Sequence, residues 1–84
     1  MNYSVAVSVT LRAGIADPEG ATIERALPAL GFSGISDVRA GKSFTLRIEA
    51  DDPSEAVMIA RSLAERLLSN PVMEDAAVRL IEEV

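Results

Sequence analysis

The chain has 84 residues and a formal net charge of −5, a sign that disfavours binding to nucleic acid and to anionic membrane surfaces. It contains neither cysteine nor histidine, which excludes thiol chemistry, zinc sites of the usual kind and histidine general bases. We expect one small domain, residues 1–84, and a domain of this length has a thin core. Without disulfides or a structural metal, association with other chains is the remaining way to stabilise it.

No apolar run approaches the roughly 18 residues that a membrane-spanning helix needs. The N-terminal residues lack the basic start and the cleavage site of a signal peptide. We therefore expect a cytoplasmic protein with no metal and no cofactor.

Residues 3–11 predict a half-buried strand, because apolar and small polar side chains alternate strictly. The apolar face carries Tyr3, Val5, Val7, Val9 and Leu11. The other face carries Ser4, Ala6, Ser8 and Thr10.

A helix is predicted to follow. Asp17 can cap it, Pro18 suits its first turn, and Gly31 can supply the left-handed residue that ends it. Its apolar stripe consists of Ile23, Ala26, Leu27 and Leu30. Pro28 removes a hydrogen bond to Glu24, so we expect the last turn to kink or loosen.

Gly41, Lys42 and Ser43 match the end of a phosphate-binding loop, but the glycine required five residues earlier is replaced by Ser36. An alternating strand, residues 43–50, follows where such a loop needs a helix. We predict instead a hairpin: a short strand at residues 35–39, a turn at residues 40–42, and a second strand whose inward side chains are Phe44, Leu46 and Ile48.

A second helix is predicted from the cap Asp52, Pro53 at its first position and Glu55 in a box-like pattern. Its stripe consists of Ala56, Ile59, Ala60, Leu63 and Leu67. Asn70 and Pro71 stop it. The tail, residues 73–84, fits either a strand or a helix.

This order indicates an α+β fold: a ferredoxin-like split β-α-β-β-α-β pattern with two helices on one face of a small antiparallel sheet. The other sheet face is small and rich in hydroxyl groups. Such a face suits close approach of a second sheet, and it equally suits ordinary exposure to solvent.

No catalytic constellation is present. The neighbouring pairs Asp51–Asp52 and Glu82–Glu83 point apart in helices or strands, so neither forms an acid/base dyad or a metal site. Arg39 and Lys42 flank the predicted hairpin tip, which makes them either contacts for an anionic partner surface or a solvated basic turn.

Several motifs together resemble the PurS family, the small subunit of phosphoribosylformylglycinamidine (FGAM) synthase. In order along the chain they are Gly14-Ile15, Asp17-Pro18, Gly20, Leu30-Gly31-Phe32, Asp37-Val38-Arg39, Gly41-Lys42 and Asn70-Pro71-Val72. The resemblance implies a non-catalytic subunit in de novo purine biosynthesis that bridges a glutaminase subunit and a large ATP-dependent synthetase subunit, assists ammonia transfer, and self-associates as a dimer or tetramer.

We take Arg39, Lys42, Asn70 and Pro71 as the candidate partner interface, with no catalytic, cofactor-binding or metal-binding residue. Two other functions remain open: a ferredoxin-like regulatory module that binds a small ligand, and a purely structural scaffold. Calorimetry with amino acids and nucleotides distinguishes the first from a bridging subunit, and co-purification with a glutaminase distinguishes the second.

Overall fold

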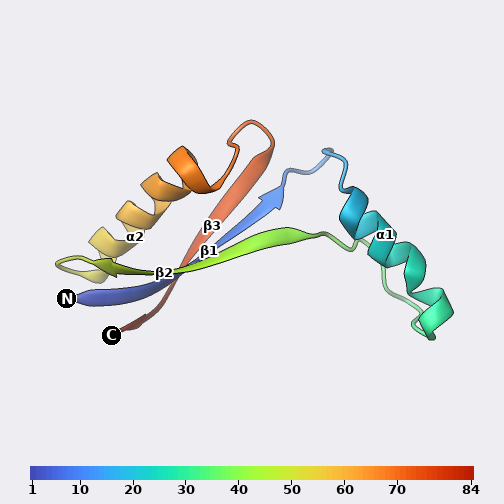
Figure 1. Cartoon of the computed structure of the whole chain (residues 1–84), viewed down its shortest axis with the longest axis horizontal. Coiled ribbons are helices and arrows are strands. Elements are labelled where there is room, and N and C mark those ends of the chain that lie inside the picture. The colour runs from blue at the N-terminus through green and yellow to red at the C-terminus, as the bar shows by residue number, and fades with distance from the viewer.

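A computed structural model describes residues 1–84. Its elements are β1 (Asn2–Leu11), α1 (Pro18–Ala26), a 3-10 turn (Pro28–Leu30), β2 (Gly41–Glu49), α2 (Pro53–Leu63), a π-helical turn (Ala64–Leu68) and β3 (Glu74–Glu83). The strands form an antiparallel sheet in the order β2-β1-β3. Helix α2 packs across all three strands, whereas α1 projects beyond one end of the sheet (Figure 1). None of the helices has the length and apolar character needed to cross a membrane.

The core lies between the central strand β1 and helix α2. The predicted inner face of β1 is confirmed, because Val5, Val7 and Val9 are fully buried. They meet three alanines spaced four residues apart on α2 and the π-helical turn: Ala56, Ala60 and Ala64. Since alanine adds only a methyl group to the helix surface, the helix backbone can lie close against the strand.

The α+β class is confirmed, and the tail left open by the sequence is the strand β3. The predicted hairpin is wrong, so the sheet has three strands and not four. Asp37 takes a positive φ of 56°, which interrupts an extended chain. The amides of Val38 and Ala40 donate to the carboxylates of Glu24 and Asp17, at 2.9 and 2.8 Å, in place of a strand partner.

Gly41 is therefore not a hairpin turn but the first residue of β2, paired with Thr10 of β1. A side chain there would place its Cβ 2.6 Å from the carbonyl oxygen of Val9. Glycine is needed at this position because the two strand backbones approach closely.

The predicted break at Pro28 is confirmed: α1 ends at Ala26, a 3-10 turn follows, and Gly31 closes it with φ 89°. The expectation that both helices cover the sheet is wrong. The apolar stripe of α1 lies outside the core, and Ile23 and Leu30 are exposed.

The predicted stripe of the second helix is correct only in part. Ala56 and Ala60 are buried, but Ile59 and Leu67 are exposed. The last turn is π-helical, and its i→i+5 hydrogen bonds put more residues into the turn, which rotates the residues that follow relative to a regular α-helix. Leu68 consequently packs against the core where regular spacing would place Leu67.

The molecule is extended. Its radius of gyration is 16.1 Å, against about 12 Å expected for a compact domain of this length. The difference comes from residues 12–40, here called the α1 arm, which continue the long axis away from the sheet (Figure 1). The arm contains one buried residue, Gly20.

Candidate functional site

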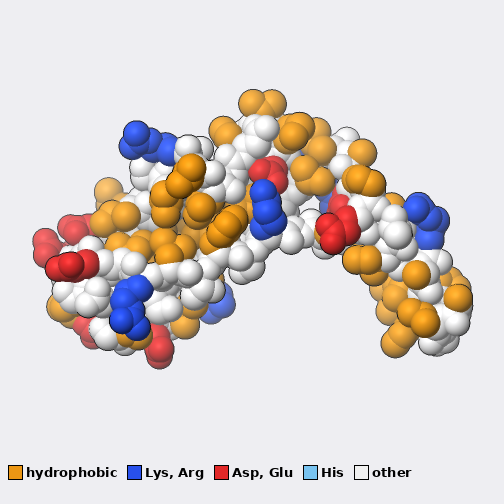
Figure 2. Space-filling view, viewed as in Figure 1, with side chains coloured by type: hydrophobic (Ala, Val, Ile, Leu, Met, Phe, Trp, Pro, Cys, Tyr) orange, Lys and Arg blue, Asp and Glu red, His pale blue; other side chains and the backbone are white.

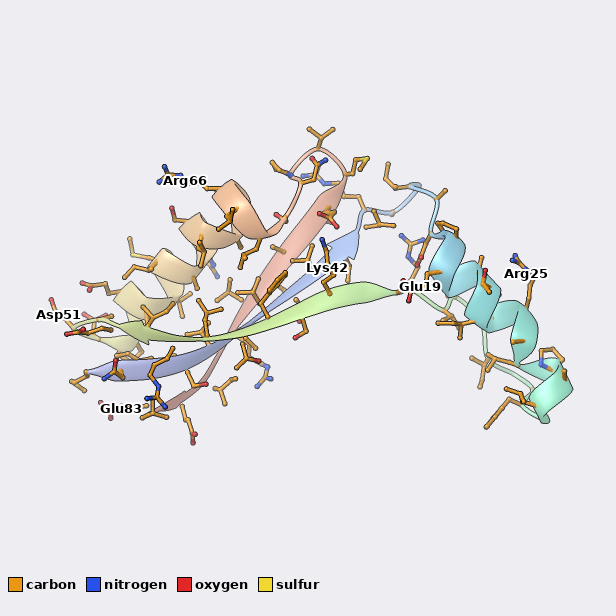
Figure 3. All side chains as sticks on the ribbon, viewed as in Figure 1. Glu19, Arg25, Lys42, Asp51, Arg66 and Glu83 are labelled. Atoms are coloured by element: carbon orange, nitrogen blue, oxygen red, sulfur yellow. The ribbon has the colours of Figure 1, made fainter.

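All four predicted interface residues lie at one end of the sheet, where β1 ends and β2 and β3 begin. Arg39 precedes β2, Lys42 is its second residue, and Asn70 and Pro71 form the turn that leads into β3. We call this region the sheet-end cluster. Figure 3 shows the labelled Lys42 near this end of the sheet and Glu19 close by at the start of α1.

Asp17 fixes the base of α1 at the sheet-end cluster. Its Oδ1 accepts the amide of Gly20 at 3.0 Å, which caps the helix, and its Oδ2 accepts the amide of Ala40 at 2.8 Å. The side chain is only 6% exposed. These hydrogen bonds, from Gly20 first and then from Ala40, lower the pKa of Asp17 against the opposing effect of burial, and the charge of Arg39 adds to the lowering.

Arg39 joins the arm to the end of β1. Its guanidinium donates to the carbonyl oxygens of Leu11 and Arg12, at 3.2 and 3.3 Å, and lies 3.9 Å from the carboxylate of Asp17. The side chain therefore has partners within the chain, and it joins the end of β1 and Asp17 to a segment that is distant from both in sequence. Its geometry makes it a positioning residue, with part of its surface still open to solvent.

Glu74 links the other predicted residues. Its Oε1 accepts the backbone amide of Asn70 at 2.7 Å, and its Oε2 lies 3.8 Å from the ammonium of Lys42. The Oδ1 of Asn70 accepts the amide of Val72 at 3.0 Å, which shapes the turn before β3. Lys42 remains 59% exposed, so its charge is available at the surface.

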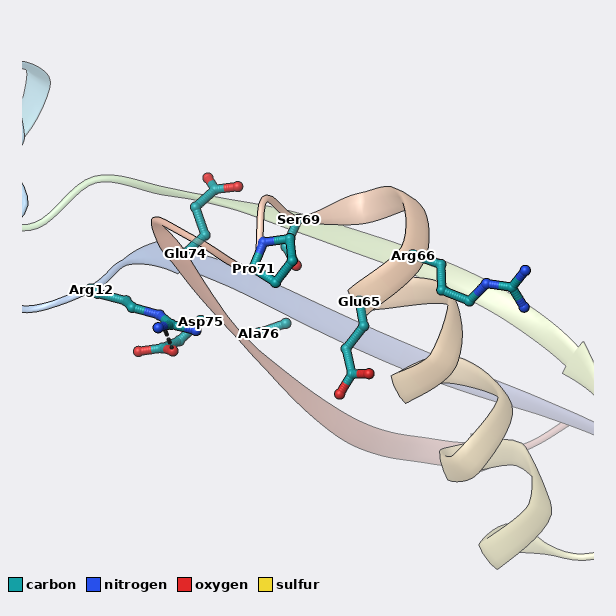
Figure 4. A pocket seen from close by; sticks show the side chains of 8 residues that line it. All are labelled: Arg12, Glu65, Arg66, Ser69, Pro71, Glu74, Asp75 and Ala76. Atoms are coloured by element: carbon teal, nitrogen blue, oxygen red, sulfur yellow. Dashed lines mark ion pairs between the residues drawn. The ribbon is translucent and has the colours of Figure 1, made fainter.

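A polar groove of about 670 Å³ opens beside this turn. It is lined by Arg12, Glu65, Arg66, Ser69, Pro71, Glu74, Asp75 and Ala76. Arg12 and Asp75 form an ion pair at one side of it, at 3.1 Å, while Arg66 points away from the other lining residues (Figure 4). Both signs of charge meet in an open groove, which suits contact with another polar surface.

Two acidic side chains of the groove have partners within the chain: Asp75 pairs with Arg12, and Glu74 with Lys42. No group of three or more carboxylates is placed to hold a metal ion, and no buried side-chain polar atom is left without a hydrogen bond. A phosphate-binding loop requires a helix N-terminus directly after it. Lys42 lies instead on the strand β2.

Sequence reasoning missed Arg12, Glu74 and Asp75. Their meeting depends on the β1–β3 register, which pairs Thr10 with Asp75 and Leu11 with Glu74. That register could not be derived from the sequence, because the pattern of residues 73–84 fits a strand and a helix equally well. The signal that could have found it is the alternation of Ala76, Val78 and Leu80, which matches the inner face of β1.

Comparison with known proteins agrees with this fold. The family model for PurS, phosphoribosylformylglycinamidine (FGAM) synthase, matches residues 4–82. This chain belongs to the PurS family. It is thus a subunit of FGAM synthase, an enzyme of purine biosynthesis, and the resemblance drawn from the sequence motifs is confirmed.

Two relatives show how far the similarity extends. The PurS subunit of Mycobacterium leprae is 54% identical over 70 residues, covering 82% of this chain and 84% of the relative. The PurS subunit of Bacillus subtilis is 37% identical over 82 residues, covering 98% and 95%. The match therefore includes the α1 arm as well as the sheet.

Solved PurS structures share the extended architecture. The PurS crystal structure from Thermotoga maritima superposes with a TM-score of 0.89 at 36% identity, covering 96% of this chain and 93% of that one. A PurS chain in the structure of PurLQS from the same organism gives 0.88 at 36% identity, covering 96% and 99%.

Proposed function

We propose that this PurS subunit joins the glutaminase subunit to the large synthetase subunit of FGAM synthase and assists the passage of ammonia between them. The observation that carries this proposal is the match to the PurS chain of the Thermotoga maritima PurLQS structure, over 96% of this chain. By that analogy the partners here are PurL and PurQ.

The composition supports a role without catalysis. Glutamine hydrolysis by a cysteine nucleophile needs a thiolate, and this chain contains no cysteine. Its polar side chains at the sheet end are engaged in positioning backbone segments and in surface ion pairs. Such a rigid polar surface suits recognition of neighbouring subunits.

We propose the sheet-end cluster as the surface that meets a partner subunit, with Lys42, Asn70 and Pro71 as its contact residues. Arg39 belongs to the same surface, but its bonds to Leu11 and Arg12 give it a structural task as well. The self-association of this subunit, as a dimer or tetramer, is also part of the proposal.

Reconstitution with the glutaminase and synthetase subunits tests the bridging role. Glutamine-dependent amidine formation should require this subunit, whereas turnover with high free ammonia should need it much less. Full glutamine-dependent activity without the subunit would contradict the proposal. Equal dependence with ammonia and with glutamine would also contradict it, and would indicate a role in shaping the synthetase active site.

Lys42→Glu tests the surface itself. Reversing a contact charge that is desolvated in the complex should weaken assembly by about 2 to 5 kcal/mol, while the isolated subunit keeps its fold. Ser54→Glu, on the outward start of α2, adds negative charge far from the sheet-end cluster and should leave assembly unchanged. Arg39→Glu is less informative because it also breaks the contacts with β1.

A further inference from the structure

The turn that leads into β3 exposes apolar side chains that its backbone does not require. Asn70, Pro71, Val72 and Met73 form this β-turn, in which the amide of Met73 donates to the carbonyl oxygen of Asn70 at 3.1 Å. Asparagine at the first position and proline at the second are residues that such a turn favours. The third and fourth positions need neither valine nor methionine, yet Val72 is 78% exposed and Met73 42%. The two side chains therefore serve neither the turn nor the core.

Hydrogen bonds hold the backbone of this turn in place. The amide of Asn70 donates to Oε1 of Glu74 at 2.7 Å, and the amide of Val72 donates to Oδ1 of Asn70 at 3.0 Å. The amide of Glu74 donates to the carbonyl oxygen of Asn70 at 2.7 Å, and the amide of Arg12 donates to that of Met73 at 2.9 Å. Because the turn is already ordered, its side chains lose little conformational entropy when a partner binds them.

The turn lies at the outer edge of the molecule. The connection between α2 and β3 extends past the end of the sheet that is opposite to the two termini (Figure 1). Apolar side chains form the outer edge of the molecule over this connection (Figure 2). One exposed apolar side chain is ordinary on a protein surface. Three in succession on an ordered turn, Pro71, Val72 and Met73, indicate a contact surface.

A second copy of this chain offers no apolar pocket for the turn. Pockets that bind apolar groups are lined mainly by hydrophobic and aromatic side chains. In each cavity of this chain, the valine, leucine, isoleucine and methionine side chains do not outnumber the polar or charged ones. The turn is therefore suited to a different protein.

The polar groove beside the turn adds a charge that is open to a partner. Two of its carboxylates are engaged within the chain, since Asp75 pairs with Arg12 and Glu74 pairs with Lys42. Glu65 lines the same groove, is exposed and forms no ion pair. A basic side chain next to the partner's pocket is the complement of this charge.

We propose that Val72 is an apolar anchor that inserts into a pocket of a partner subunit, and that this pocket is apolar and has a basic side chain on its rim. Pro71 and Met73 flank the anchor. Asn70 is a positioning residue, because its side chain shapes the turn. This inference rests on the bridging role proposed above, and it specifies the chemistry of one contact that the role requires.

Val72→Asp tests the anchor in the complex reconstituted with the glutaminase and synthetase subunits. Burying a carboxylate in an apolar pocket is strongly unfavourable, so the Kd for assembly should rise by about 30-fold or more. Val84→Asp is the matched control, because it makes the same change at the other end of β3, where Val84 is 48% exposed. It should leave the Kd within about threefold. Fluorescence anisotropy of a labelled subunit measures the Kd, and circular dichroism confirms that the variants are folded.

Substitution of Asn70 tests the position of the anchor while its side chain is kept. Asn70→Ala removes the acceptor of the Val72 amide, so the Kd should rise by about fivefold, as for the loss of one hydrogen bond. Asn70→Asp retains an acceptor oxygen that can form the same turn, and it should bind nearly as well as the wild type. Equal weakening by the two substitutions would contradict the positioning role.

The outcomes separate this inference from the bridging role. If Val72→Asp assembles as tightly as the wild type, the anchor is wrong, and the glutamine and ammonia comparison still tests the bridging role. If Val72→Asp abolishes self-association of the isolated subunit and leaves the Kd for the partner subunits unchanged, the turn binds a second copy and the proposal is also wrong. Full glutamine-dependent activity without the subunit would contradict the bridging role itself, whatever the Kd of the variants.

Discussion

The sheet with α2 and the α1 arm use apolar residues in opposite ways. On β1, alternate side chains disappear completely beneath α2, and Val5, Val7 and Val9 have no exposed surface. On α1, an apolar stripe of similar clarity in the sequence stays in contact with solvent. Periodicity therefore shows that a helix or strand has an apolar face, but it does not show whether the chain's own core covers that face.

The two regions are also held by different forces. Burial of the valines and alanines stabilises the sheet, a contribution with little dependence on pH. The base of the arm is held by backbone amides donated to the carboxylates of Asp17 and Glu24. The arm should consequently respond to acid and to charge substitution, and the sheet to loss of volume.

Removing volume from the core should give the largest effect. Val7→Ala deletes two buried methyl groups and leaves a gap beneath α2, so the free energy of unfolding should fall by about 2 to 3 kcal/mol. For a chain of this length the total is on the order of 4 to 12 kcal/mol. Urea denaturation followed by circular dichroism measures the change.

The control variants for Val7→Ala change residues on the open face of the sheet and on the α1 arm. Ser8→Ala changes an exposed neighbour, and Ile23→Ala changes the arm in dilute, monomeric protein. Both should alter the free energy of unfolding by less than about 0.5 kcal/mol. An equal loss for Ile23→Ala and Val7→Ala in the monomer would remove the distinction between the two regions.

Asp17 should make the arm sensitive to acid. Because hydrogen bonds lower its folded-state pKa, its contribution is fully present above the ordinary carboxyl pKa of about 3.9. That contribution is lost as the pH falls through the lower folded-state value. Hydrogen exchange at the Ala40 amide, corrected for intrinsic rate, should therefore accelerate below about pH 4, while the β1 amides remain protected.

Asp17→Asn is the control for this acid effect. Asparagine still caps α1, but it has one acceptor oxygen, so it cannot accept from Gly20 and Ala40 as two carboxylate oxygens do. The Ala40 amide should then exchange faster at neutral pH and lose its acid dependence. An unchanged acid response in this variant would assign the effect to another carboxylate.

Most of the sheet core could be predicted from the sequence, because alternation in β1 and β2 and the cap at Asp52 are local signals. Asp52 accepts the amide of Glu55 at 2.8 Å, as expected. The hairpin could not be excluded locally, since the amides of Val38 and Ala40 are taken by side chains 14 and 23 residues away. The four candidate interface residues lie in one region of the structure. The contacts of Glu74 with Lys42 and Asn70 could not be predicted, because they depend on the pairing register of β3.

Tyr3 provides the corresponding alkaline probe for the sheet. Burial raises its pKa first of all, and the nearby charges of Glu83, Asp52 and Asp51 add to the shift. The neutral phenol is thus favoured in the folded state, and stability is lost as the pH rises from about 10, the ordinary pKa, through the raised value. As the chain has one tyrosine and no tryptophan, absorbance of the phenolate reports this site alone. Its midpoint should lie above that of the urea-unfolded chain; coincident midpoints would contradict burial of the hydroxyl.

Lys42→Ala should give the smallest effect. The ammonium lies 3.8 Å from Glu74 and is largely exposed, and such surface pairs contribute less than about 1 kcal/mol. We expect the free energy of unfolding to change by less than about 0.5 kcal/mol. Because Lys42 lies on β2 and has no helix N-terminus before it, the isolated subunit should bind no ATP at micromolar concentration, with or without the substitution. Calorimetry tests this directly: saturable ATP binding lost in Lys42→Ala would show that this residue, at the junction of arm and sheet, contacts phosphate after all.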